Sequence, residues 1–359
     1  MNGNDSGSQS SAQARAENSP LGNLSSLTSQ LTGVQHTSPL VTDSLAKAQQ
    51  YVKPSQQGMN WDTLCQQAAV EAQAADQTRD KMIQYSASKF AVPFHNDDKS
   101  RIKALMSCVG SGKSSACIME LLRLGCLQPP AADGVRYSRT VVIRATYAQL
   151  ESTTLATWRF WLPPKICVIK RGTRITGHIH QKLADGTWLD MEFIFMALDS
   201  DQWLDNLQGL EITFFWINEF VELKAPKAVL SHLMSRLGRY PSVQTSPIRW
   251  AGGLLDYNPP KIGSYAYELF ETDAKPEAFN LYKYEPPLIM TPHKDDPDDL
   301  SRATYIPNPE ADYVRFQNFG YDYWYNYVSD FGTDANRIRR MVLGDYTYVD
   351  DGNLSLIHI

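Results

Sequence analysis

A nine-residue run, SCVGSGKSS at positions 107–115, limits what this chain can fold into more than any other feature. The apolar stretch KALMSC leads into the run and the stretch SSACIMELLRL leads out of it, which predicts a strand, a tight turn and a helix. In such a turn, glycines let backbone N–H groups approach a phosphate, the helix N-terminus favours an anion, and a lysine supplies a cation. We therefore predict that the run binds the phosphates of a nucleotide.

The residues predicted to hold the nucleotide all belong to this turn: Ser107, Gly110, Ser111, Gly112, Lys113, Ser114 and Ser115. The hydroxyl of Ser114 is also the predicted ligand of a magnesium ion. The run departs from the full pattern G-x-x-x-x-G-K-[ST] because Ser107 stands where the first glycine is expected. The alternative interpretation is a glycine-rich turn that binds nothing.

Strand and helix signals alternate through the middle of the chain, from IKALMSC to IRWAGGLLDY. Short β-rich runs separated by helical patterns predict an α/β fold of the P-loop NTPase type, with a mainly parallel central sheet flanked by helices. The stretch ICVIKRGTRITGHIHQ, followed by DMEFIFMAL, instead has the pattern of a hairpin. Helical lid and linker segments are expected on either side of this core.

Composition divides the chain into five segments. Residues 1–58 are rich in Ser, Gln, Asn and Thr, which predicts a disordered polar arm. Residues 59–100 are expected to form a helical lid, with helix from Trp61 to about Phe90, and residues 101–270 the ATPase core. Residues 271–352 are expected to complete that domain and form a linker, with helices over DYWYNYVSDF and from about Asp334 to Leu343. The last six residues, LSLIHI, match the translation of a sequencing adapter, so 353–359 are expected to be a non-native tail of a truncated gene.

Charge, cysteines and hydropathy exclude several classes of protein. The net charge of -5 and the pI near 5.8 argue against a uniformly basic nucleic-acid coat. The five cysteines include no CxxC pair, so neither a disulfide framework nor a zinc site is indicated. No apolar run approaches the roughly 18 residues that a membrane span needs. The composition is that of a cytoplasmic globular protein.

A second polar motif ends an apolar run, LEITFFWINEF. Nucleotide hydrolases place at such a strand end an acidic residue that holds magnesium through water, followed by a glutamate that activates the attacking water. Glu219 is the predicted general base, and Asn218 takes the magnesium position in which aspartate is usual. The alternative is a buried strand that ends in a surface turn.

Four segments between about residues 80 and 352 together resemble the large terminase ATPase of tailed bacteriophages. They are SCVGSGKSS, VVIRATYAQLESTTLATWRFWLP, WINEFVELKAPKAVLSHLMSRLGRYPS and LLDYNPP. The last segment stands where that family has its coupling motif. Asp256 and Tyr257 replace the usual hydroxyl residues there, and the resemblance implies that Asn258 senses the γ-phosphate.

The resemblance also implies an arginine that acts on the γ-phosphate, because many relatives carry one early in the phosphate loop. This chain has Ser107, Cys108 and Val109 in that neighbourhood, so the arginine must come from elsewhere. The three candidates are Arg144, Arg236 and Arg239. For each, the alternative is a surface ion pair or a contact with a DNA phosphate.

The function implied by the resemblance is hydrolysis of ATP with Mg2+ to drive double-stranded viral DNA into a procapsid. The implied partners are the DNA, the portal protein, the small terminase subunit and further copies of this chain in a ring, in the cytoplasm of an infected bacterium and at the procapsid portal. The segment GDYTYVDDG resembles the entry to the family's nuclease domain, so Asp350 and Asp351 are expected to be turn residues, with the nuclease domain absent and no nuclease activity. The alternatives are a helicase-like P-loop ATPase and a nucleotide-binding structural module whose hydrolysis is weak because Asn218 lacks a charge.

Overall fold

The computed structural model describes residues 84–199, 203–242, 246–273, 275–297 and 299–347. The chain divides into two units, Met1–Tyr85 and Ser86–Ile359, and nearly all of the described residues belong to the second. The predicted arm at 1–58, most of the predicted lid and the tail at 353–359 lie outside the described residues. Asp350 and Asp351 lie outside them as well.

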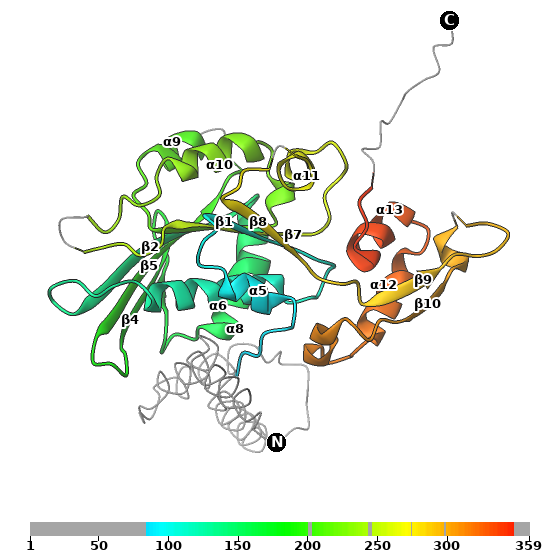
Figure 1. Cartoon of the computed structure of the whole chain (residues 1–359), viewed down its shortest axis with the longest axis horizontal. Coiled ribbons are helices and arrows are strands. Elements are labelled where there is room, and N and C mark those ends of the chain that lie inside the picture. Colours follow the sequence, from blue (N-terminus) through cyan, green and yellow to red (C-terminus); the bar gives the residue numbers. More distant parts are fainter. Residues whose placement is uncertain (1–83, 200–202, 243–245, 274, 298, 348–359) are drawn as a thin grey trace, which may run out of the picture. The chain divides into compact units, whose positions relative to one another are not determined.

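An eight-stranded sheet in the order β3-β4-β5-β2-β6-β7-β1-β8 forms the centre of the second unit (Figure 1). The strands from β5 to β8 in this order are parallel, and β3 and β4 form an antiparallel hairpin at one edge. Their bounds are β1 Ile102–Met106, β2 Val135–Arg144, β3 Val168–Lys170, β4 Ile175–Lys182, β5 Trp188–Ala197, β6 Phe214–Asn218, β7 Gly252–Tyr257 and β8 Phe279–Lys283. The predicted α/β class with a mainly parallel sheet is confirmed.

The central strands are apolar because helices cover both of their faces. Every residue of β1, β6 and β7 is buried, as expected for parallel strands between two helical layers. A Cβ atom at Gly253 would lie 2.1 Å from the ring of Phe215, so only glycine fits beside this aromatic side chain.

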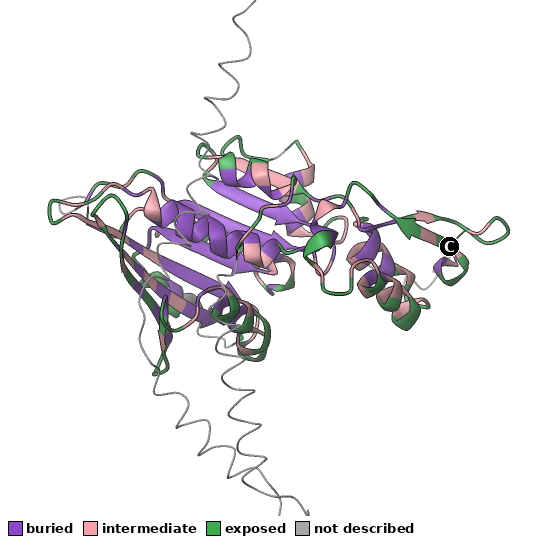
Figure 2. Cartoon of the chain, turned by 90° about the horizontal axis from the view of Figure 1, so that it is seen from below, coloured by how far each residue is buried: buried purple, intermediate pink, exposed green. Residues whose placement is uncertain are grey.

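Two groups of helices cover the sheet, one on each face (Figure 1). One group comprises α9 Trp203–Gln208, α10 Pro226–Met234 and α11 Tyr265–Glu271, and the other α5 Ala91–Asn96, α6 Lys113–Cys126 and α8 Leu155–Trp161. Short helices precede α8 (α7 Tyr147–Gln149, η1 Leu150–Thr154) and follow β6 (η2 Phe220–Glu222). Figure 2 shows the sheet and the inner sides of the helices as the buried core. Among the described residues no helix is long and apolar enough to cross a membrane.

Aromatic side chains fill much of this core. On the face of α8, Trp158 packs edge-on against Phe193, with ring centroids 4.6 Å apart, and lies parallel to Trp216. On the face of α10 and α11, Leu233 and Phe270 belong to one apolar cluster with the strands.

The segment after β8 forms a smaller group of elements. A two-stranded ribbon, β9 Leu288–Thr291 with β10 Thr304–Pro307, is followed by helical segments. These are η3 Leu300–Arg302 within the ribbon's connection, and then η4 Asp312–Phe316, α12 Asp322–Phe331, α13 Ala335–Ile338 and η5 Arg339–Leu343. The helix predicted over DYWYNYVSDF is α12, and the second predicted helix corresponds to α13 with η5. Trp324 of α12 is fully buried against Tyr313.

One predicted helix boundary is wrong. The sequence predicts helix up to about Phe90, but residues 84–90 are not helical and α5 begins at Ala91. Ser88 contributes to this start, because its side-chain Oγ accepts from the N–H of Ala91 at 3.3 Å. Serine competes with the preceding backbone for such bonds, which favours a helix start over a helix interior.

A buried ionic cluster lies between α5, β1 and α6. The carboxylate of Glu120 accepts from Arg123 Nε and His95 Nδ1, each at 2.8 Å, and from Lys103 Nζ. Lys103 and Glu120 are fully buried. Burial disfavours the charge on Glu120, but the neighbouring cations outweigh this effect and hold its pKa at about 2.

We expect Glu120→Gln to destabilise the fold by about 3–5 kcal/mol, because it leaves the buried Lys103 without a counter-ion. Since the pKa of Glu120 falls from 4.5 to about 2 on folding, its contribution is present above pH 4.5 and is lost toward pH 2. Urea unfolding from pH 7 to pH 3 measures both effects. Glu277→Gln, at an exposed position, is the control; an equal stability of Glu120→Gln and this control at pH 7 would contradict the assignment.

Candidate functional site

The polar residues predicted from the sequence meet at the carboxyl ends of three neighbouring parallel strands. In the register of the sheet, Met106 of β1 lies beside Tyr257 of β7, and Asp256 of β7 lies beside Asn218 of β6. The turn 107–112 follows β1, so it reaches the same edge as the ends of β6 and β7. Ligands of open α/β sheets bind at this edge.

The turn has the backbone form that its glycines predict. Gly110 and Gly112 have φ angles of 74° and 85°, in the left-handed region that favours glycine. A Cβ atom at Gly112 would meet nothing within 4 Å, so the backbone conformation alone explains this glycine. Gly112 is the residue before α6, which begins at Lys113. The first N–H groups of this 14-residue helix therefore face the turn.

Lys113 is a buried cation with neutral partners. Its side chain is held by the carbonyl oxygens of Ser107 (3.2 Å) and Cys108 (2.9 Å) and by Oδ1 of Asn258 (2.9 Å). The residue is 5% exposed, and it forms no ion pair with a carboxylate in the part of the chain that the structure describes. The charge of Lys113 interacts with the carboxylate of Glu219 without forming a direct ion pair, so this ammonium group is suited to receive an anion.

Ser114, the next residue, faces two polar side chains from the neighbouring strands. Its hydroxyl donates to Oδ2 of Asp256 at 2.7 Å and accepts from Nδ2 of Asn218 at 3.1 Å. The same amide nitrogen donates to both carboxylate oxygens of Asp256 at 3.0 Å. Asn218 thus lies at the predicted magnesium position, but it presents N–H groups to Ser114. The carboxylate of Asp256 beside a serine hydroxyl suits a hard cation such as Mg2+.

Glu219, the predicted general base, has an unusual backbone. Its φ and ψ are 56° and 59°, which makes it the one non-glycine residue with a positive φ in the described ranges. Such a conformation costs about 1–3 kcal/mol and is concentrated at functional sites. Burial raises the pKa of Glu219, although Lys113 opposes this shift. A raised pKa brings a carboxylate closer to the range useful for proton transfer.

Asn258 connects the two charged groups of the site. Its Oδ1 accepts from Lys113 Nζ at 2.9 Å, and its Nδ2 donates to Oε2 of Glu219 at 3.3 Å. One amide therefore contacts both the predicted phosphate ligand and the predicted base.

Of the three candidate arginines, the structure brings only Arg144 to the site. Its guanidinium donates to the carbonyl oxygen of Asn218 at 3.1 Å and pairs with Glu222 at 3.3 Å. Arg236 and Arg239 follow α10, at the other end of β6. The carbonyl of Arg236 accepts from the N–H of Ile212, which precedes that strand.

Arg236 and Arg239 therefore do not lie at this chain's own phosphate loop. Six residues of extended chain, about 20 Å at about 3.3 Å each, separate Ile212 from Asn218. Both arginines follow α10, which comes after β6 and the short helix η2. The helix runs back across the sheet, so the residues after it return to the amino end of the strand.

The remaining residues predicted to bind nucleotide lie in or beside the turn. Ser107 is buried and supplies a carbonyl to Lys113, and Ser111 Oγ donates to the carbonyl of Cys108 at 3.0 Å. The hydroxyl of Ser115 accepts from the indole N–H of Trp161 at 2.8 Å. Ser115 thus ties α6 to α8.

The segment after β8 also contacts the phosphate loop, which the sequence did not predict. Trp324 Nε1 donates to the carbonyl of Val109 at 2.9 Å, and Gln317 Nε2 donates to that of Gly110. Arg340 Nε donates to the carbonyl of Pro259 at 2.7 Å. Burial lowers the pKa of Arg340, and the negative charges of Glu219 and Glu222 oppose that shift. A second arginine therefore lies near the predicted base.

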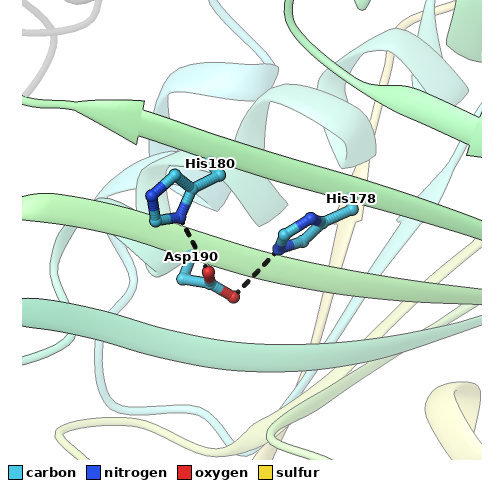
Figure 3. A group of neighbouring side chains, drawn as sticks. All are labelled: His178, His180 and Asp190. Carbon is cyan, nitrogen blue, oxygen red and sulfur yellow. Dashed lines mark hydrogen bonds and ion pairs between the residues drawn. The ribbon is translucent and has the colours of Figure 1, made fainter.

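One other group of side chains could hold a metal ion, on the hairpin edge of the sheet (Figure 3). His178 and His180 of β4 point toward Asp190 of β5, with N···O distances of 3.1 and 2.8 Å. Both histidines are about half exposed, and the carboxylate already accepts from both rings. These residues belong to the edge hairpin and are separate from the phosphate loop.

Neither a family model nor a curated protein matches this chain. Among solved structures, it is similar to the large terminase ATPase domain of Thermus phage P74-26, with 14% identity and a TM-score of 0.44, over 73% of this chain and 95% of that domain. It is also similar to the large terminase of bacteriophage HK97, with 12% identity and a TM-score of 0.46, over 73% of this chain and 51% of that one. The large terminase of a thermophilic bacteriophage in complex with ADP gives 11% identity and a TM-score of 0.48, over 73% and 54%. The chain thus spans about half the length of these full-length terminases. Each of these three solved structures is a phage large terminase or its ATPase domain.

Proposed function

We propose that this chain hydrolyses ATP with the help of Mg2+. The observation that carries the proposal is the position of Lys113, a buried cation with only neutral partners, at the turn between β1 and α6. An ATP triphosphate supplies the negative charge that this lysine lacks, and the N–H groups at the start of α6 add to its binding.

Each residue of the site has a defined task in this proposal. Lys113 and the turn hold the β- and γ-phosphates, and the hydroxyl of Ser114 is a ligand of Mg2+, with Asn218 beside it. Bound Mg2+ would supply positive charge that offsets the negative charge of the phosphates. Glu219 accepts a proton from the attacking water, and Asn258 links this base to Lys113.

Two arginines are placed to act near the γ-phosphate within the same chain. Arg144 is fixed by Glu222 and by the carbonyl of Asn218, and Arg340 is fixed by the carbonyl of Pro259. Both interact with the acidic group formed by Glu219 and Glu222. A guanidinium in such a position stabilises the charge that develops on the transferred phosphoryl group.

We further propose that hydrolysis drives double-stranded viral DNA into a procapsid. The four sequence segments that resemble large terminases support this step. In this role the chain works as a ring of copies at the portal protein, with a small terminase subunit, in the cytoplasm of an infected bacterium. The contacts of Trp324 and Gln317 with the phosphate loop give a route by which a change at the nucleotide reaches the C-terminal elements.

Phosphate release from ATP, measured with and without double-stranded DNA, tests this function. We expect magnesium-dependent release that double-stranded DNA stimulates more than single-stranded DNA does. Stimulation by single strands alone would favour a helicase-like ATPase. ATP binding with negligible release in both conditions would favour a nucleotide-binding structural module.

A further inference from the structure

Asp256 is a buried carboxylate with neutral partners, which mirrors the situation of Lys113 on the other side of Ser114. It is fully buried, and its oxygens accept from Ser114 Oγ, Asn218 Nδ2, Trp216 Nε1 and the backbone N–H of Glu219 at 2.7–3.3 Å. None of these donors carries a charge, and Asp256 has no ion pair with a lysine, arginine or histidine of the described ranges. A buried carboxylate of this kind is suited to face a cation.

Asn218 cannot supply the oxygen ligand that a magnesium ion needs. Its Oδ1 accepts from the hydroxyl of Thr154 at 2.6 Å, so the amide turns its NH2 group toward Ser114 and Asp256. Magnesium takes oxygen ligands, most often one or two carboxylates together with phosphate and water. An amide N–H facing the ion offers neither a lone pair nor a charge.

The register of the sheet explains how Asp256 can replace the missing charge. Asn218 is the last residue of β6, and Asp256 lies directly beside it on the parallel strand β7. Both side chains reach the hydroxyl of Ser114, at 3.1 and 2.7 Å. A carboxylate at position 256 on β7 therefore contacts the same serine as a carboxylate at position 218 on β6 would.

We propose that Asp256, and not Asn218, supplies the carboxylate of the magnesium site beside Ser114. The proposal rests on the proposed ATPase function and names a residue for it on the neighbouring strand. Asn218 then acts as a positioning residue: bonded to Thr154 on one side, it orients the carboxylate of Asp256 with its NH2 group.

The test measures the dissociation constant of ATP with and without Mg2+, and the binding of Mn2+ to the ATP-bound protein by electron paramagnetic resonance. In Asp256→Asn, we expect the gain in ATP affinity that Mg2+ gives to fall about 10- to 100-fold, with a matching loss of Mn2+ affinity. ATP affinity without Mg2+ should be retained, because Lys113 still holds the phosphates. Asp273→Asn, at an exposed position after α11, is the matched control.

The double variant Asn218→Asp with Asp256→Asn returns the carboxylate to β6. It should recover most of the magnesium effect, because the charge again lies beside Ser114. If Asp256→Asn alone does not fold, the double variant still tests whether a carboxylate beside Ser114 binds the metal ion.

The outcomes separate this inference from the proposed function. If Asp256→Asn keeps the full magnesium effect, or loses ATP affinity equally with and without Mg2+, the inference is wrong while the ATPase proposal stands. The inference also fails if the folded double variant remains as defective as the single one, or if Mg2+ gives the unaltered protein no gain. If the unaltered protein does not bind ATP at all, the proposed function itself fails.

Discussion

Glu219→Gln is expected to reduce ATP hydrolysis by about 10²- to 10⁴-fold, the usual contribution of a general base, while ATP still binds. Glutamine keeps the size of the side chain, and its amide can still meet Asn258, which lies 3.3 Å from Glu219. It cannot accept a proton from water. Single-turnover phosphate release and fluorescent-nucleotide binding, measured on one preparation, give the two quantities.

Glu211→Gln provides the matched control for this variant. Glu211 is exposed and lies before β6, toward the end opposite to Glu219, so the same chemical change is made away from the site. The control should hydrolyse ATP at the rate of the unaltered protein. Normal ATP turnover in Glu219→Gln would show that Glu219 is not the general base. Loss of ATP binding would show that the charge of Glu219 is needed to bind ATP.

Lys113→Ala is expected to abolish measurable ATP binding at concentrations that saturate the unaltered protein, and to reduce hydrolysis by about 10²- to 10³-fold or more. The ammonium group is the one that the carbonyls of Ser107 and Cys108 hold at the turn. Removing it leaves no cation there for the β- and γ-phosphates. Isothermal titration with ATP and Mg2+ measures the loss of binding.

The same variant should not lose stability in the absence of nucleotide. Lys113 is buried without a carboxylate partner among the described residues, so its removal relieves a desolvation cost. The melting temperature without ATP should equal or exceed that of the unaltered protein, and ATP should no longer raise it. Lys224→Ala, at an exposed lysine, is the control; ATP binding by Lys113→Ala at the control's affinity would contradict the assignment.

Local patterns in the sequence predicted the parts of the fold and site that depend on neighbouring residues. The strand, turn and helix around Lys113 follow from an apolar run, two glycines and a helix-forming run. The hairpin of β3 and β4 was likewise predicted from alternating apolar and polar residues. Glu219 was located because it directly follows a buried strand, and Asn258 because LLDYNPP resembles the coupling motif of large terminases.

Features that depend on the order of strands were not accessible to the same reasoning. Asp256 looked like a departure from a hydroxyl-containing motif, because only the pairing of β6 with β7 places it beside Asn218 and Ser114. The sequence did contain one signal for this role of Asp256: an uncharged Asn218 at the usual magnesium position and an acidic residue near the end of another strand.

The positions of the arginines could not be predicted from the sequence either. Arg340 is 81 residues from its partner Pro259, and no local pattern connects the two. Arg236 is near Glu219 in the sequence, but α10 carries the chain back to the opposite end of β6. Proximity along the chain is a poor guide wherever a helix crosses the sheet.

The most direct measurement of the central claim is a crystal structure with a non-hydrolysable ATP analogue and Mn2+, whose anomalous signal locates the ion. We expect the triphosphate against the turn 107–112, with its terminal phosphates beside Lys113 and the Mn2+ signal beside the hydroxyl of Ser114. A nucleotide bound elsewhere, or a crystal that takes up none at saturating concentration, would contradict it.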